Sequence, residues 1–117
     1  MSTGVGSISG AVLRQFTLWL QKDAMLSADG AVDYAPGLAL VGTPVLVVAG
    51  KLDRTAPVAN VKVGFDALGG PKRFFIAGEV NGFRYDYGHM DLVIGDRASV
   101  ELWPRIHAFF EAAAPER

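Results

Sequence analysis

The sequence predicts an α/β protein with a parallel sheet. Its elements alternate in the order helix, strand, helix, strand, helix, which is typical of parallel strands joined by crossover helices. The first strand, residues 44–50, reads Pro-Val-Leu-Val-Val-Ala-Gly and contains five consecutive apolar residues. A strand with one wet face would alternate polar and apolar residues, so we expect this one to be buried on both faces.

The composition supports one packed domain. The chain has 117 residues, of which 50% are hydrophobic and 20% charged, and this apolar content is enough to offset the entropy of ordering the backbone. The chain has eleven basic and twelve acidic residues. It therefore lacks the excess of basic residues that is typical of nucleic-acid binding or of polybasic membrane binding. The chain has no cysteine, so disulfides, thiolate catalysis and cysteine metal sites are excluded.

No segment is expected to cross a membrane. The uncharged stretch at residues 35–50 contains Pro36 and Pro44 and is too short to span about 30 Å of hydrocarbon as a helix. The N-terminus lacks the basic and apolar regions of a signal peptide. We therefore expect a soluble protein with a cytoplasmic location.

The first predicted element is a helix that follows a flexible, Gly/Ser-rich N-terminus at residues 1–10. Apolar residues recur at three-to-four spacing through residues 11–26, with polar residues on the opposite face. Ser9 is the expected N-cap and Gly30 the expected stop. Residues 27–43 contain Asp-Gly and Pro-Gly turn signals and are expected to form a loop.

A helix and a second strand follow the buried strand. Pro57 suits the first turn of a helix, where its missing N–H removes no hydrogen bond. The apolar stripe of this helix consists of Val58, Val61, Phe65 and Leu68. Gly69-Gly70-Pro71 is expected to end the helix through a left-handed glycine and the proline. Residues 72–77, Lys-Arg-Phe-Phe-Ile-Ala, form the second strand.

A long glycine-containing loop over residues 78–98 is expected to precede the last helix. Pro104 is tolerated only in the first turn of a helix, so we expect the regular helix to begin near Val100 or Glu101. The side chains expected to face inward are those of Leu102, Trp103, Ile106, Phe109, Phe110 and Ala113.

A side chain capable of acid–base chemistry follows each predicted strand. Asp53 comes shortly after the first strand, and His89 lies in the loop after the second. Because the carboxyl ends of adjacent parallel strands meet at one edge of a sheet, we expect Asp53 to reach the His89 imidazole. A carboxylate placed in this way holds one tautomer of the ring and stabilises the imidazolium that forms when the ring takes a proton. Such a pair is the acid and histidine half of a nucleophilic triad.

The same residues resemble the α/β-hydrolase fold family. Residues 44–57, Pro-Val-Leu-Val-Val-Ala-Gly-Lys-Leu-Asp-Arg-Thr-Ala-Pro, are similar to the strand and turn that carry the acid in those enzymes. The stretch Gly88-His89-Met90-Asp91, ahead of an amphipathic last helix, is similar to their histidine loop, and Tyr-Gly-His-Met-Asp-Leu-Val-Ile-Gly resembles the lipase and esterase branch. The resemblance implies that residues 35–117 are the C-terminal part of such a core, after a helical cap-like segment at residues 11–34.

The resemblance also implies roles for single residues. Asp53 would be the triad acid and His89 the general base of a carboxylic ester hydrolase that needs no metal or organic cofactor. The nucleophile has no match, since neither Ser7 nor Ser9 has glycine at both −2 and +2, as a Gly-x-Ser-x-Gly elbow requires. We therefore expect the chain to be inactive alone and to act on a small ester only when a missing N-terminal part completes the site.

Simpler interpretations exist for each of these residues. Asp53 could cap the following helix or lie in a turn, and His89 could be a loop histidine bonded to backbone. Tyr85 and Tyr87 would line a substrate pocket or pack in the core. Asp91 is expected to bond backbone N–H groups and to shape the histidine loop.

Two further histidine-containing features carry weaker signals. Asp86, His89 and Asp91 could be drawn as a metal site, but one histidine with two loop aspartates is a poor ligand set. His107 lies on the last helix, away from the inward stripe, and is expected to be a solvated surface residue.

A second class of function follows from the strand count. Two parallel strands and three helices cannot cover both faces of residues 45–49 and 74–76, and small isolated sheets are marginal in water. The alternative to an enzyme is a catalytically inert α/β module that self-associates or binds a partner chain through the exposed sheet edge. Under this hypothesis we expect a homo-oligomer, an aggregate or a poorly ordered monomer.

Overall fold

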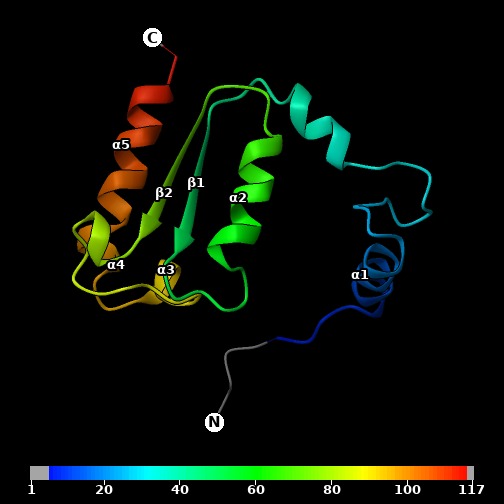
Figure 1. Cartoon of the computed structure of the whole chain (residues 1–117), viewed down its shortest axis with the longest axis horizontal. Helices are drawn as coiled ribbons and strands as arrows, with labels where there is room; N and C mark the ends of the chain where they lie inside the picture. Colours follow the sequence, from blue (N-terminus) through cyan, green and yellow to red (C-terminus); the bar gives the residue numbers. More distant parts are fainter. Residues whose placement is uncertain (1–5, 116–117) are drawn as a thin grey trace. The chain divides into compact units, whose positions relative to one another are not determined.

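The protein is an α/β chain with a two-stranded parallel sheet. The computed structural model describes residues 6–115, and the chain divides into two compact units between Ala39 and Leu40. Strand β1 spans Val45–Gly50 and strand β2 spans Lys72–Ala77; they run parallel, and both end at the same edge of the sheet (Figure 1). The positions of both predicted strands and their parallel direction are confirmed.

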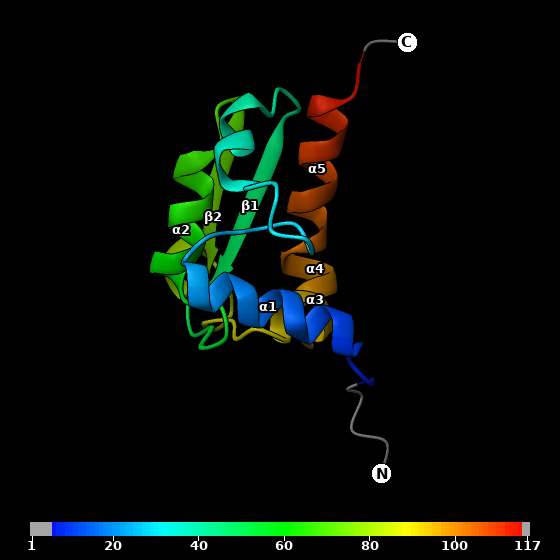
Figure 2. The same ribbon diagram turned by 90° about the vertical axis from the view of Figure 1, so that its right-hand side faces the viewer.

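One helix lies on each side of this sheet. Helix α2, Val58–Ala67, lies on one side of the strands and α5, Trp103–Ala113, on the other (Figure 2). In β1, Ala49 and Gly50 are buried, while residues 45–48 are partly exposed. The expectation that this strand is buried on both faces is therefore wrong for most of its length, because one helix per side leaves the flanks of a two-stranded sheet uncovered.

Helix α2 has the predicted stripe but a different end. All four stripe residues are partly buried. Leu68 at the C-cap is extended, and neither Gly69 nor Gly70 is left-handed, so the expected glycine stop is wrong. Instead, the Lys72 ammonium donates to three carbonyl oxygens at the end of the helix, at 2.9, 3.1 and 2.7 Å. These bonds satisfy carbonyl groups at the end of the helix, which the backbone N–H groups of a left-handed glycine motif would otherwise satisfy.

The chain between β2 and α5 is more regular than expected. It contains three short helices, which are η2 (Glu79–Asn81), α3 (Asp91–Ile94) and α4 (Ala98–Glu101). Helix α5 begins at Trp103 with Pro104 in its first turn, slightly later than the expected Val100 or Glu101. Proline has no N–H group to donate, so it fits only in the first turn of a helix, where the N–H groups have no intrahelical partner. The helix therefore begins directly before Pro104.

The inward face of the last helix is narrower than predicted. Leu102 is buried, and Ile106 and Phe109 are partly buried. Trp103 and Phe110 are 52% and 64% exposed, and Ala113 is exposed as well. The break between α4 and α5 interrupts the periodicity, and two strands are too narrow to cover a wider apolar face.

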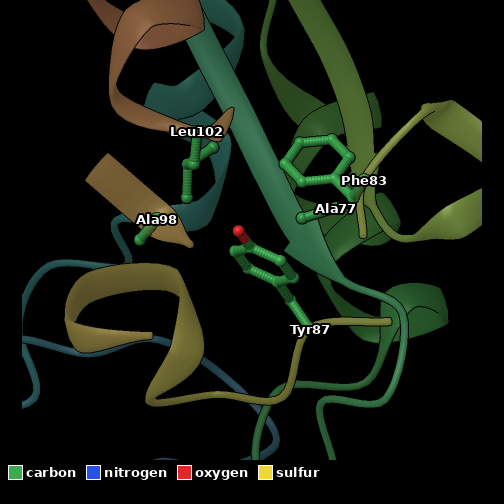
Figure 3. Packing of buried hydrophobic residues seen from close by; sticks show 5 residues of the cluster. All are labelled: Ala77, Phe83, Tyr87, Ala98 and Leu102. Carbon is green, nitrogen blue, oxygen red and sulfur yellow. The ribbon is translucent and has the colours of Figure 1, made fainter. Parts of the chain in front are cut away.

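A small core lies beside the loops that follow the strands. Its buried members, drawn in Figure 3, are Ala77, Phe83, Tyr87, Ala98 and Leu102. The Tyr87 ring packs edge-on against Phe83, with 5.1 Å between centroids, and stacks on Tyr85 at 5.0 Å. The best-packed part of the molecule is therefore at the carboxyl edge of the sheet.

The N-terminal unit is built on helix α1, Gly10–Lys22. Ser9 is its N-cap, as predicted, and the Ser9 hydroxyl accepts the Ala11 N–H. The helix ends at Asp23 and not at Gly30, because Asp23 itself adopts the left-handed conformation, which aspartate tolerates better than most residues.

The segment after α1 is partly ordered. Residues 27–43, expected to be a loop, include the 3₁₀ helix η1 (Ala35–Leu40), and Leu26 forms an isolated bridge with Asp33. Residues 1–5 of the expected flexible segment lie outside the described residues. Within residues 6–115, no helix has both the length and the apolar character to cross a membrane.

Candidate active site

The loops after β1 and β2 are tied together by backbone hydrogen bonds. The Ala77 carbonyl at the end of β2 accepts the N–H groups of Lys51 and Tyr87, each at 3.1 Å. The Leu52 N–H donates to the Tyr87 carbonyl at 2.9 Å. The turn after β1 and the later loop therefore form one bonded unit.

Gly50 lies where these two loops cross. A Cβ at this position would stand 2.6 Å from the Tyr87 carbonyl oxygen, and 3.3 Å from both the Gly88 carbonyl oxygen and the Asp53 Cβ. Backbone can approach this closely only where there is no side chain. Gly50, three residues before Asp53 in the stretch similar to the acid-bearing turn, is thus what lets the histidine loop pass over the end of β1.

Asp53 is buried, and its two carboxylate oxygens have different partners. Oδ1 accepts the N–H groups of Thr55 and Ala56 at 2.9 and 2.8 Å. Oδ2 lies 2.8 Å from Nδ1 of His89. Asp53 therefore closes a turn and faces the histidine at the same time. It does not cap α2, whose N-cap is Pro57 without a side-chain bond.

The surroundings of Asp53 favour its charged form. The Ala56 N–H lowers the pKa of this carboxyl below its ordinary value of 3.8; burial opposes the shift, and the contacts with His89 and the Thr55 N–H lower the pKa further. Asp53 is therefore ionised at neutral pH. A negative charge next to Nδ1 favours the neutral tautomer in which Nδ1 carries the proton. Nε2 is then free to accept a proton.

His89 combines a fixed position with access to solvent. The preceding Gly88 N–H donates to Asp91 Oδ2 at 2.7 Å, and α3 begins just after the histidine. The His89 side chain is 49% exposed, whereas that of Asp53 is 2% exposed. The pair thus has a buried acid and a reachable base, which suits proton transfer to or from a molecule in solution.

The remaining predicted residues have clear positions. Asp91 shapes the histidine loop through its bond to Gly88. Tyr87 is fully buried, so it lies in the core and not on a surface open to substrate, while Tyr85 is partly buried. The His107 side chain is 75% exposed, and its Nε2 lies 3.7 Å from Oε1 of Glu111 on the same helix.

Residues 6–115 contain no cluster of side chains suited to a metal ion. Asp86 accepts the Glu79 N–H at 2.9 Å, while His89 and Asp91 have the separate partners described above. In the described part of the chain, no three His, Cys, Asp or Glu side chains gather closely enough to hold a metal. The drawn site of Asp86, His89 and Asp91 is therefore not formed.

Two residues that shape the site, Glu101 and Gly50, were not predicted from the sequence. Glu101 accepts hydrogen bonds from the Tyr87 hydroxyl at 2.8 Å and from the Arg84 N–H at 3.0 Å. Nothing local in the sequence links it to residues so distant along the chain. For Gly50 a signal was present, since it ends the first strand three residues before Asp53.

Fold and site together define an α/β protein with a buried aspartate bonded to an accessible histidine at the carboxyl edge of a parallel sheet. Comparisons with models of protein families, with curated proteins and with solved structures find no match for this chain. The resemblance to α/β hydrolases therefore rests on the motifs and on their order along the chain.

We predict that Gly50→Ala disrupts the site, because the added methyl group would collide with the Tyr87 carbonyl. Overpacking of this kind costs about 1–3 kcal/mol, measured as the free energy of unfolding in denaturant. Gly64→Ala is the matched control: Gly64 lies inside α2 with nothing within 4 Å of its would-be Cβ, so this change should raise stability by about 0.5–1 kcal/mol. Equal effects of the two changes would contradict the crossing at Gly50.

We also predict that the neutral His89 ring carries its proton on Nδ1. Asp53→Asn removes the charge that favours this tautomer, so the proton should redistribute toward Nε2. Ring ¹⁵N chemical shifts measure the two populations, and exposed His107 provides an internal reference. Asp86→Asn, which removes a carboxylate from the same loop, should leave the His89 shifts unchanged. Wild-type His89 shifts that match those of His107 would show that the pair does not form.

Proposed function

We propose that this chain supplies the acid and the general base of a serine hydrolase acting on carboxylic esters. Asp53 is the acid and His89 the base, and the serine nucleophile comes from outside this chain. The observation that carries the proposal is the 2.8 Å contact between Asp53 Oδ2 and His89 Nδ1, with the acid buried and the base half exposed.

The chemistry is acyl transfer in two steps. His89 Nε2 takes the proton of the serine hydroxyl as its oxygen attacks the ester carbonyl, and the imidazolium then passes that proton to the leaving alcohol. Water attacks the acyl-serine in the second step; His89 takes the water proton and returns it to the serine oxygen as the carboxylic acid leaves. The ionised Asp53 stabilises the imidazolium in both steps.

Several features support this proposal over a purely structural role. A turn aspartate needs one carboxylate oxygen to accept backbone N–H groups, and Oδ1 alone accepts both of them here. The second oxygen is left for the histidine. The order of strand, Asp53, helix, strand, His89 and helix matches the order in the family that the sequence resembles. The histidine-loop motif points to esters as the substrate class.

The serine residues near the N-terminus do not fit the nucleophile. Ser9 caps α1 through its hydroxyl, and Ser7 lacks the flanking glycines of an elbow. In complete sites, the loss of one triad member leaves residual catalysis from binding and from oxyanion stabilisation. This chain supplies two triad members and no nucleophile, so we expect no turnover of unactivated esters; with an activated ester, the His89 imidazole held by Asp53 can still react directly.

We predict that the chain releases nitrophenolate from p-nitrophenyl acetate in a reaction that depends on His89. His89→Ala should slow the release about tenfold, which is less than the roughly 10²–10⁴-fold that a general base contributes in a complete site. Asp53→Asn should slow it as well, whereas His107→Ala, which removes the exposed histidine of α5, should not. Release is followed by absorbance under pseudo-first-order conditions.

Two results would contradict this assignment. A rate that survives His89→Ala unchanged would remove His89 from the chemistry. Covalent labelling of a serine in the chain by a fluorophosphonate probe, detected by mass spectrometry, would show that the chain carries its own nucleophile.

A second candidate function is association, and the exposed apolar surface beside the sheet favours it. Apolar side chains of β1 and α5 line a groove of about 290 Å³ that includes Leu46, Val48, Ile106 and Phe109. Phe110 also lines the groove, and its side chain is 64% exposed. Exposed apolar patches of this kind commonly mark contacts with another chain, and a second copy of this chain would bury the same side chains.

We predict that Phe110→Ser shifts the chain toward monomer in sedimentation velocity experiments. Val80→Ser is the matched control, since Val80 is 76% exposed but does not line the groove. A wild-type chain that sediments as a monodisperse monomer and unfolds cooperatively would contradict the association hypothesis and leave the hydrolase proposal untouched.

A further inference from the structure

Tyr87 connects the histidine loop to the core through both its backbone and its side chain. Its N–H donates to Ala77 and its carbonyl accepts the Leu52 N–H, so the residue bonds to the ends of both strand regions. Its side chain is fully buried, and the hydroxyl points toward the helical segment that carries Ala98 and Leu102 (Figure 3). The proposed reaction makes no use of this side chain.

Glu101 holds the Tyr87 hydroxyl in place. Its Oε2 accepts the hydroxyl at 2.8 Å, and its Oε1 accepts the Arg84 N–H at 3.0 Å. Nε of Arg97 lies 3.6 Å from Oε1 of Glu101, and the Glu101 side chain is 14% exposed. One carboxylate on α4 therefore fixes two points of the loop that leads to His89.

The charge state of this contact is well defined. Burial opposes ionisation of Glu101, but the bonds from Tyr87 and the Arg84 N–H, together with Arg97, outweigh it and lower the pKa of the carboxyl below its usual range. Burial first and Glu101 second raise the pKa of the Tyr87 hydroxyl. The tyrosine stays protonated as a donor to a carboxylate, which makes the hydrogen bond a strong, charge-assisted one.

This contact lies two residues from the histidine. Tyr87 is fixed by Glu101 on one side of His89, and the Gly88 N–H is fixed by Asp91 at 2.7 Å. The Tyr87 carbonyl also accepts the Leu52 N–H, so the position of Tyr87 bears on both the histidine loop and the turn that leads to Asp53. Displacements of about 1 Å in a catalytic geometry can lower rates by orders of magnitude.

We infer that Tyr87, held by Glu101, is a positioning residue for the Asp53–His89 pair. This inference rests on the proposed function for its catalytic meaning. Its structural content is that the Tyr87–Glu101 bond sets the distance between Asp53 Oδ2 and His89 Nδ1.

The test compares Tyr87→Phe with Tyr85→Phe in the full chain. Tyr87→Phe keeps the packed ring and deletes the bond to Glu101, whereas Tyr85→Phe deletes the hydroxyl of the ring stacked on Tyr87 and leaves that bond in place. Two readouts are taken on folded protein: the ring ¹⁵N shifts of His89, and the His89-dependent release of nitrophenolate from p-nitrophenyl acetate. Denaturant unfolding measures stability separately.

We expect Tyr87→Phe to move the His89 shifts toward those of the Asp53→Asn variant and to slow the His89-dependent reaction about threefold to tenfold. Tyr85→Phe should change neither. Glu101→Gln provides a second variant should Tyr87→Phe fail to fold. It keeps one acceptor oxygen but loses the charge and cannot accept from both partners, so a smaller change in the same direction is expected.

The inference is overturned when Tyr87→Phe or Glu101→Gln lowers stability while the His89 shifts and reaction rate stay at wild-type values, because the contact then serves stability alone. The two proposals fail separately. A wild-type chain without any His89-dependent reaction overturns the proposed function, while the ring shifts still report whether Tyr87 positions the pair.

Discussion

The close approach of the Tyr87 carbonyl to Gly50 is the contact on which the rest of the site depends. It is possible only because residue 50 has no side chain, since a Cβ there would stand 2.6 Å from that oxygen. The approach lets the histidine loop cross the end of β1 and accept the Leu52 N–H. Asp53 follows directly in the chain, so its carboxylate meets His89 as a consequence of this crossing.

The two interpretations of Asp53 are compatible in this structure. One carboxylate oxygen closes a turn by accepting two backbone N–H groups, and the other faces His89. The turn bonds keep the carboxylate in its charged form and in a fixed orientation. The aspartate that closes the turn and the carboxylate that faces the histidine are therefore the same residue, acting through its two oxygens. Glu101 likewise uses its two oxygens for different partners: one accepts the Arg84 N–H and the other accepts the Tyr87 hydroxyl.

The sequence predicted the elements whose signals are local. The apolar run of β1, the short β2, the Ser9 cap and the meeting of Asp53 with His89 all follow from neighbouring residues or from the geometry of parallel strands. Two of the predictions that fail do so because of contacts between different elements. Lys72 ends α2 from the following strand, and Glu101 reaches back to Tyr87; neither has a local signal. The number of buried side chains on α5 was overestimated. The spacing of apolar residues identifies one face of a helix, but it does not tell how wide a sheet is present to cover that face.

The central claim is that the turn of Asp53 and the loop of His89 form one hydrogen-bonded unit. Native-state amide hydrogen exchange measures this most directly, since bonded amides exchange only when the local structure opens. The amides of Leu52 and Ala56, which donate to the Tyr87 carbonyl and to Asp53 Oδ1, should be protected as strongly as the amides bonded between β1 and β2. Exchange of both at the rate of an unprotected chain, with the strand amides still protected, would contradict it.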